Sequence, residues 1–92
     1  MKRRLRVVIK GTVQGVGYRY FAITRAGSLG LKGWVRNVPN GDVEVVAEGE
    51  EPALTRFEEM LKRGPMGAHV RDVIAVYLPA TGEFHDFQVR RF

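Results

Sequence analysis

A glycine-rich segment that ends in an arginine is the part of this 92-residue sequence best suited to chemistry. It reads Gly-Thr-Val-Gln-Gly-Val-Gly-Tyr-Arg over residues 11–19 and directly follows an alternating apolar stretch. Glycines let backbone N–H groups turn toward an anion without interference from a Cβ atom, and a guanidinium binds two oxygens at once. A helix that follows such a segment adds the positive end of its dipole. The segment therefore predicts a site for phosphate or a similar oxyanion that includes Arg19.

The glycine spacing by itself is weak evidence for this site. Glycine-rich loops between a strand and a helix are common, and this one lacks the Gly-Lys-Ser/Thr ending of a Walker A motif. Arg19 has an alternative role as an exposed cation at the start of a helix. A positive charge near a helix N-terminus is unfavourable unless an anion binds there, so its position favours the anion site.

Asn37 is the second candidate for chemistry, at the end of a predicted strand. Its amide oxygen can accept a hydrogen bond from water and its NH₂ group can donate to an oxyanion, but the amide does not titrate and cannot act as a general base. Without further information, a role in the turn at Pro39-Asn40-Gly41 is about as well supported.

Hydrophobic periodicity predicts the elements that must position these residues. Alternating apolar residues indicate strands, and apolar residues three and four apart indicate helices. Gly30 and Gly64-Pro65 are placed to end the two helices, and Pro39-Asn40-Gly41-Asp42 is typical of a hairpin turn. In order, we expect a strand at 5–10, a helix at 18–29, strands at 31–38 and 43–48, a helix that begins in 49–52 and ends at 63, a strand at 70–78 and a short strand within 84–89.

The order β-α-β-β-α-β with a short last strand predicts an α+β fold of the ferredoxin-like split βαβ type. In that fold an antiparallel sheet carries both helices on one face. The length suits one domain over residues 1–92. Because the strands that flank the first helix run parallel to each other, we expect the 14–19 segment and Asn37 at the same end of the sheet.

Positive charge is concentrated in the first part of the chain. Residues 1–41 hold nine Lys and Arg and no acidic residue, whereas residues 42–92 have a net charge of −4. A field of this kind attracts anionic ligands. The four cations nearest the N-terminus are expected to form a solvated strand edge: Lys2, Arg3, Arg4 and Arg6.

Composition excludes several classes of function. The absence of cysteine from the sequence excludes disulfides, thiolate zinc sites and cysteine nucleophiles. No apolar run approaches the roughly 18 residues of a membrane span, and the N-terminus does not resemble a signal peptide, so we expect a soluble cytoplasmic protein. His69 and His85 lack the spacing of metal ligands, and we expect neither a metal nor a cofactor.

Three residue types near the candidate site have supporting roles in this interpretation. We expect Gln14 to brace the loop through hydrogen bonds to the backbone, and Tyr18 and Tyr20 to support it from behind. Trp34 is expected to be a packing residue, because a strand interior usually buries one face.

The two candidate segments resemble the signatures of the acylphosphatase family. Residues 11–19 are similar to the first signature, although the common pattern has Phe where this chain has Tyr18. Gly33-Trp34-Val35-Arg36-Asn37, with Gly41-Asp42-Val43-Glu44 downstream, is similar to the second. Further landmarks extend the resemblance over nearly the whole chain: Gly49-Glu50, Phe57, Gly64-Pro65, residues 68–73 and Phe87.

The resemblance implies an enzyme that hydrolyses the carboxyl-phosphate bond of acyl phosphates to a carboxylate and inorganic phosphate, without metal or cofactor. It implies that Arg19 binds the phosphate and that Asn37 positions the attacking water. It also implies that backbone amides bind phosphate oxygens over Gly15, Val16, Gly17, Tyr18 and Arg19. We expect a monomer that acts on a small molecule, with no nucleic-acid or membrane partner.

The chemistry of the residues agrees with this expectation. An acyl phosphate has a stable carboxylate leaving group, so its hydrolysis mainly requires positioning and stabilisation of charge on the phosphoryl oxygens. The alternative is an RNA-binding module, because the RNA-recognition motif shares this topology. Residues 32–35 resemble the start of its RNP1 pattern, but residues 36–39 lack the aromatics that stack bases, and Glu44 and Glu48 would repel phosphates. A purely structural anion-binding domain is a third possibility, which only turnover distinguishes.

Overall fold

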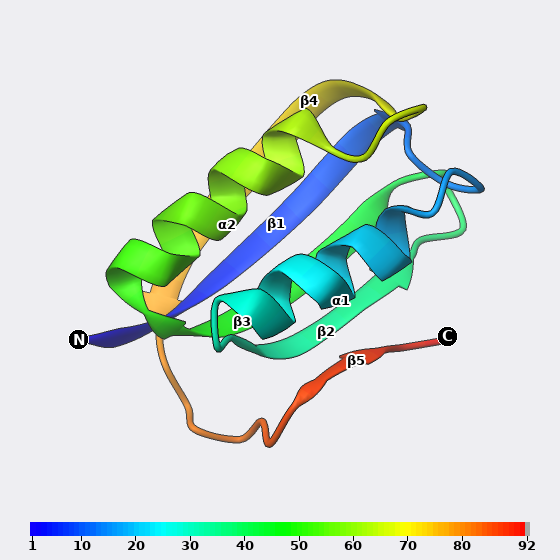
Figure 1. Cartoon of the computed structure of the whole chain (residues 1–92). Helices are drawn as coiled ribbons and strands as arrows, with labels where there is room; N and C mark the ends of the chain where they lie inside the picture. Colours follow the sequence, from blue (N-terminus) through cyan, green and yellow to red (C-terminus); the bar gives the residue numbers. More distant parts are fainter. Residues whose placement is uncertain (92) are drawn as a thin grey trace.

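The computed structural model describes residues 1–91, in which one five-stranded sheet carries two helices on one face (Figure 1). The predicted ferredoxin-like α+β fold is confirmed. No helix among these residues is long and apolar enough to cross a membrane. The elements are β1 (Lys2–Thr12), α1 (Tyr18–Ser28), β2 (Lys32–Asn37), β3 (Val43–Glu50), α2 (Glu51–Arg63), β4 (His69–Pro79) and β5 (Phe87–Val89).

The strand order β4-β1-β3-β2-β5 places the start of α1 and the end of β2 at one end of the sheet. β1 and β2 are each antiparallel to β3, which lies between them, so they run parallel to each other as expected. The chain therefore leaves β1 and β2 at the same end. This arrangement brings the glycine-rich loop close to Asn37.

The last strand departs from the expected antiparallel sheet. β5 pairs with β2 in parallel, with Val35 opposite Val89, so the complete sheet is mixed. The segment after β4 crosses from one edge of the sheet to the other along the same end (Figure 1). β5 must therefore run opposite to β4, which is the direction of β2. The strand is also shorter than expected, because Phe84 lies outside it.

The N-terminal cations do not form a strand edge, contrary to the prediction. β1 lies between β4 and β3, and its residues alternate between the helix side and the open side of the sheet. On the open side, Arg4 Nε lies 2.7 Å from a Glu48 oxygen and Arg6 Nε lies 2.9 Å from a Glu44 oxygen. These cations pair with carboxylates of the neighbouring strand β3.

A hydrophobic core between the sheet and the helices holds α1 and α2 in place. The apolar faces of the strands and helices meet there, as their periodicity predicts. Removing these side chains from water is the main favourable contribution to folding. Residues with no exposed surface include Leu5, Val7 and Ile9 of β1, Ala22 and Ala26 of α1, and Leu54, Phe57 and Leu61 of α2.

Candidate active site

The loop between β1 and α1 has a backbone suited to binding an anion. Gly15 and Gly17 have φ values of 76° and 79°, a left-handed conformation that glycine adopts without strain. Within residues 1–91, the amides of residues 15–17 donate no hydrogen bond to other backbone groups. The first amides of α1 also lack intrahelical partners, and its first turn contains no acidic residue. The loop and the helix start therefore keep N–H donors for a ligand.

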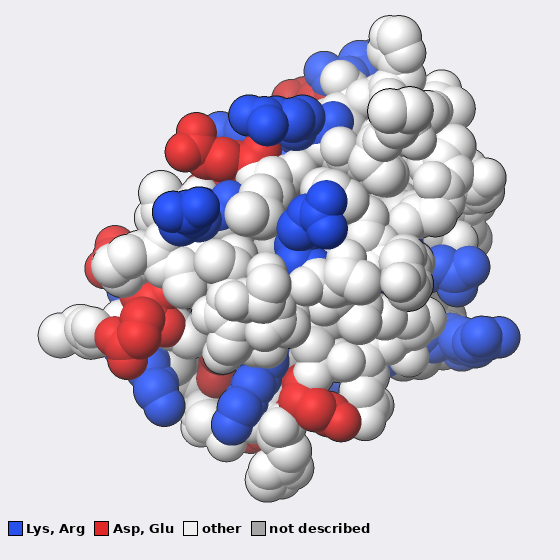
Figure 2. Space-filling model, in the orientation of Figure 1, with Lys and Arg blue, Asp and Glu red and all other residues white. Residues whose placement is uncertain are grey.

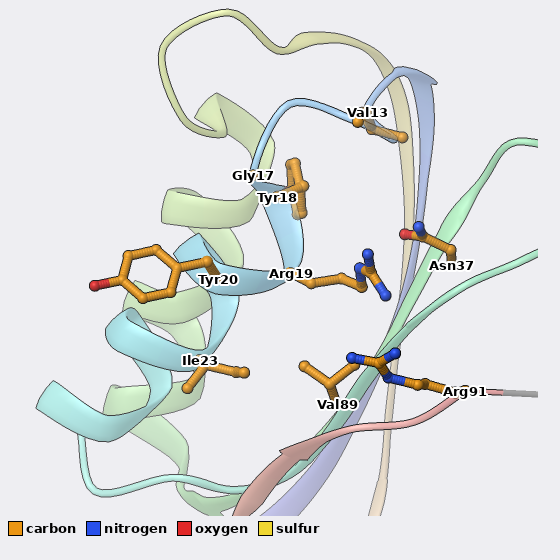
Figure 3. A pocket seen from close by; sticks show the side chains of 10 residues that line it. Val13, Gly17, Tyr18, Arg19, Tyr20, Ile23, Asn37, Val89 and Arg91 are labelled. Carbon is orange, nitrogen blue, oxygen red and sulfur yellow. The ribbon is translucent and has the colours of Figure 1, made fainter.

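A pocket of about 300 Å³ opens beside this loop (Figure 3). It joins parts of the chain that are far apart in sequence: the loop, the first turns of α1, the end of β2 and the segment that includes β5. Its lining residues are Val13, Gly15, Gly17, Tyr18, Arg19, Tyr20, Ile23, Asn37, Val89 and Arg91.

Most of the site residues expected from the sequence meet in this pocket. Gly15, Gly17, Tyr18, Arg19 and Asn37 all line it. The remaining one, at position 16, is a half-buried valine that packs against the hydrophobic core and is not part of the lining.

Arg19 extends from the first turn of α1 toward Asn37 (Figure 3). It is partly buried, so it is not a fully exposed helix-start cation. No ion pair or hydrogen bond engages its guanidinium within the part of the chain that the structure describes. A partly desolvated cation at the positive end of a helix is stabilised by a bound anion. The geometry favours the anion-binding role.

Asn37 is the last residue of β2, and its carboxamide lines the pocket. The turn that follows is held by other groups. Asn40 Nδ2 lies 3.2 Å from an Asp42 oxygen, and the Asp42 amide donates to Asn40 Oδ1 at 3.0 Å. The Val38 amide donates to the Asp42 carbonyl at 2.8 Å. Because the turn does not use the Asn37 side chain, its carboxamide is available to a ligand or a water molecule.

Gln14 links the loop to the segment that follows Asn37. Its Nε2 donates to the carbonyls of Val38 at 2.7 Å and Asp42 at 2.9 Å. The Asp42 side chain in turn pairs with Lys10 at 2.7 Å, and this hydrogen bond lowers the pKa of the carboxyl. The expected bracing by Gln14 is confirmed, and its partners lie on the other side of the site.

The two tyrosines have different roles. Tyr18 is almost fully buried, and its hydroxyl donates to the Leu61 carbonyl of α2. Burial raises the pKa of this phenol. Tyr18 thus supports the helix start from behind, as expected, whereas the prediction for Tyr20 is wrong: its side chain is 74% exposed at the pocket.

Trp34 lies outside this pocket and is partly buried. The guanidinium groups of Arg36 and Arg90 lie 5.9 and 4.7 Å from its ring centre. Its packing partners therefore include two arginines, through cation–π contacts.

The pocket has a basic character. Its lining contains two arginines and, among the described residues, no carboxylate. Figure 2 shows basic side chains and, in the part of residues 1–91 visible in this view, no acidic one at the end where α1 begins and the C-terminal segment lies. Such a lining favours a ligand with negative charge.

Arg91 is the charged pocket residue that sequence reasoning missed, together with the apolar Val13, Ile23 and Val89. It follows β5, whose parallel pairing with β2 brings it to the site. One signal in the sequence could have indicated it. Arg91 is two residues after the apolar Val89, and alternate residues of an extended segment share a face. A three-residue strand is too short for that signal to identify its partner.

Comparisons with known proteins agree with the geometry of this site. A family model described as Acylphosphatase matches residues 5–89. An acylphosphatase from Acaryochloris marina is 49% identical over 87 residues, which cover 95% of this chain and 92% of that protein. One from Methanothrix thermoacetophila is 44% identical over 85 residues, which cover 92% and 93%. The crystal structure of acylphosphatase from Bacillus subtilis matches with a TM-score of 0.93 and 37% identity, over 99% of this chain and 100% of that one.

These comparisons do not support the RNA-binding alternative. The open face of the sheet agrees with them, because three of its arginines, Arg4, Arg6 and Arg36, are paired with carboxylates of β3. Arg6 and Arg36 both bind Glu44, at 2.9 and 2.7 Å. An RNA-binding sheet instead presents aromatic side chains that stack bases.

Proposed function

This chain belongs to the acylphosphatase family, and we propose that it hydrolyses a small acyl phosphate in the pocket beside the glycine-rich loop. The bond cleaved is the one between the carboxyl group and phosphate, and the products are a carboxylate and inorganic phosphate. One observation supports this location: Gly15 and Gly17 of the loop line the same basic pocket as Arg19 and Asn37, and the amides of residues 15–17 donate no hydrogen bond to described backbone groups.

The phosphoryl group binds to the loop amides and to Arg19. The amides of residues 15–19 point their positive ends at its oxygens, and the guanidinium binds two oxygens in parallel. These donors are already held in place by the backbone, so little reorganisation is required as charge shifts in the transition state. The lack of other partners for Arg19 within the described chain supports this role.

The Asn37 carboxamide positions the attacking water. Its oxygen accepts a hydrogen bond from the water, and its NH₂ group donates to a phosphoryl oxygen. The water attacks phosphorus in line with the leaving oxygen, as phosphoryl transfer requires. Since an amide does not take up the proton, the protons of the water pass to phosphate oxygens or to solvent.

The reaction requires neither a strong acid nor a metal in this proposal. The leaving group is a carboxylate, which is stable without protonation near neutral pH. The pocket lining supplies N–H donors and guanidinium groups, and among the described residues it includes no carboxylate, imidazole or thiolate to ligate a metal. The donor set therefore suits direct binding of the anion.

Phosphate release from benzoyl phosphate in the presence of excess chelator tests the proposal. We expect turnover that is unchanged by the chelator and competitively inhibited by inorganic phosphate. Loss of turnover with the chelator, restored by added divalent cation, would contradict metal independence. Phosphate inhibition that is not competitive would contradict the shared site. The monomeric state, the cytoplasmic location and a single domain over residues 1–92 stay predictions from the sequence.

A further inference from the structure

Arg91 enters the pocket from the strand next to β2, the strand that ends at Asn37. The pairing of β5 continues past its last residue, since the Arg90 amide donates to the Val35 carbonyl at 2.9 Å. Arg90 then faces Trp34 on the open side of the sheet, whereas Val89 and Arg91 line the pocket on the helix side. This alternation directs Arg91 to the site through the backbone of the strand.

Figure 3 shows how the three charged or amide side chains of the pocket lie relative to one another. In the view of Figure 3, the guanidinium of Arg19 lies between the carboxamide of Asn37 and the guanidinium of Arg91. Arg91 is exposed, and no carboxylate or hydrogen-bond partner engages it within residues 1–91. It brings a second full positive charge to a pocket that already contains Arg19.

In-line displacement relates this arrangement to the positions of the attacking water and the leaving group. The entering water and the leaving oxygen lie on opposite sides of phosphorus in the transition state. If the phosphoryl group sits on Arg19 and the loop, with the water at Asn37, the leaving oxygen faces Arg91. The side chains of Ile23 and Val89 lie beside that region of the pocket and form an apolar wall for the acyl group (Figure 3).

We propose that Arg91 contacts the acyl half of the substrate and stabilises the carboxylate as it leaves, an inference that rests on the function proposed above. The P–O bond to the acyl oxygen breaks, and its electron pair stays on that oxygen, beside the Arg91 guanidinium. A new P–O bond forms to water, and both hydrogens of the water end on the phosphate. An acyl phosphate dianion and water thus give one carboxylate and one dihydrogen phosphate, with charge conserved.

Arg91→Gln tests this role when it is measured over a series of ring-substituted benzoyl phosphates. Interactions with developing charge matter most where the leaving carboxylate is most basic. We expect kcat/KM to fall roughly ten- to hundredfold for the substrate with the most basic carboxylate, the size expected from losing one charge-assisted hydrogen bond. The loss should shrink steadily as electron-withdrawing substituents lower the basicity, and the inhibition constant of inorganic phosphate should stay the same. Arg91→Lys should recover part of the loss.

Arg90→Gln is the matched control, because Arg90 is the same residue type on the other side of the sheet. It should leave the dependence on the leaving group unchanged. An equal loss with every substrate in Arg91→Gln, or a matching rise in the phosphate inhibition constant, would overturn the inference and indicate a general electrostatic or phosphate-binding role. Unchanged kinetics in Arg91→Gln would also overturn it, while leaving the roles of Arg19 and Asn37 intact. Full activity in Arg19→Lys would instead contradict the proposed function.

Discussion

The side-chain amide of Gln14 donates a hydrogen bond of 2.7 Å to the carbonyl of Val38, across the end of the sheet. Gln14 belongs to the glycine-rich loop, and Val38 directly follows Asn37. The contact therefore ties the loop proposed to bind phosphate to the segment of Asn37, the residue proposed to position the water. Catalysis by positioning depends on such supporting contacts, because small displacements of catalytic groups reduce rate strongly.

Gln14→Ala should lower turnover more than phosphate affinity. It removes the hydrogen bonds to Val38 and Asp42 and frees the end of β2 to move relative to the loop. We expect kcat to fall and the free energy of unfolding to drop by about 1–2 kcal/mol, since each hydrogen bond contributes roughly 1 kcal/mol net. Steady-state kinetics and urea unfolding measure both. Gln88→Ala is the control, because Gln88 is exposed and binds only Asp86 among the described residues.

Arg19→Lys should abolish most activity although the charge is kept. A lysine ammonium cannot reproduce the two parallel hydrogen bonds of a guanidinium. We expect kcat/KM to fall by about 10²–10³, the cost of removing one donor to transition-state charge. Arg25→Lys, on the same helix and with its guanidinium 4.6 Å from the Phe21 ring centre, should be nearly neutral. Similar effects of the two substitutions on kcat/KM would argue against a specific role of Arg19.

Asn37→Ala should reduce kcat while the inhibition constant of inorganic phosphate changes little. In the proposed mechanism the substitution removes the group that orients water, whereas the loop amides and Arg19, which also line the pocket, still bind the anion. Asn40→Ala is the control that distinguishes water positioning from damage to the turn, because Asn40 holds Asp42 in that turn through two hydrogen bonds. It should cost stability and retain more turnover than Asn37→Ala. Equal losses of turnover and phosphate affinity in Asn37→Ala would contradict water positioning.

The stabilising contribution of Glu48 should be lost in acid. The carboxylate is 8% exposed, and burial alone would raise its pKa, but hydrogen bonds from the Thr81 amide, Arg4 and the Gly82 amide outweigh burial and lower the pKa from 4.5 to about 2. Because the folded pKa lies below the unfolded one, this stabilisation is present above about pH 4.5 and is lost as pH falls toward 2.

Denaturant unfolding between pH 7 and pH 2 measures the contribution of Glu48. We expect Glu48→Gln to lower the free energy of unfolding at pH 7 by about 1.5–3 kcal/mol, the value of a hydrogen bond to a charged group. The variant should also lose part of the dependence on pH below 4.5. Glu59→Gln, on the exposed side of α2, should behave like the unsubstituted protein. A Glu48→Gln variant with an unchanged pH profile would refute the assignment.

Tyr18→Phe should keep activity and lose some stability. The ring still fills its place in the core, but the hydrogen bond to the Leu61 carbonyl disappears. We expect the free energy of unfolding to fall by about 0.5–1.5 kcal/mol, with kcat/KM nearly unchanged. Urea unfolding and the phosphate-release assay test the two statements together. A large fall in kcat/KM with intact stability would show that the hydroxyl has a direct role at the site.

The sequence by itself determined the local features of this protein. Alternating and helical periodicities established the order of the main strands and helices, because each element buries one face. Gly15 and Gly17 marked a loop that turns without interference from Cβ atoms, and both adopt a left-handed conformation. The split βαβ order then placed this loop and Asn37 at one end of the sheet, since strands on either side of the first helix run parallel.

Only the tertiary structure decided which distant side chains meet. The N-terminal cations were expected at the edge of the sheet. Their strand instead lies inside it, where Arg4 and Arg6 pair with Glu48 and Glu44 of β3. The parallel pairing of β5 with β2 brings Arg91 to the pocket. Periodicity reports which face of an element is buried, but strand order and register follow from contacts between residues far apart in sequence. For that reason the meeting of the glycine-rich loop with Asn37 was predictable from the chain, and the position of Arg91 in the pocket was not.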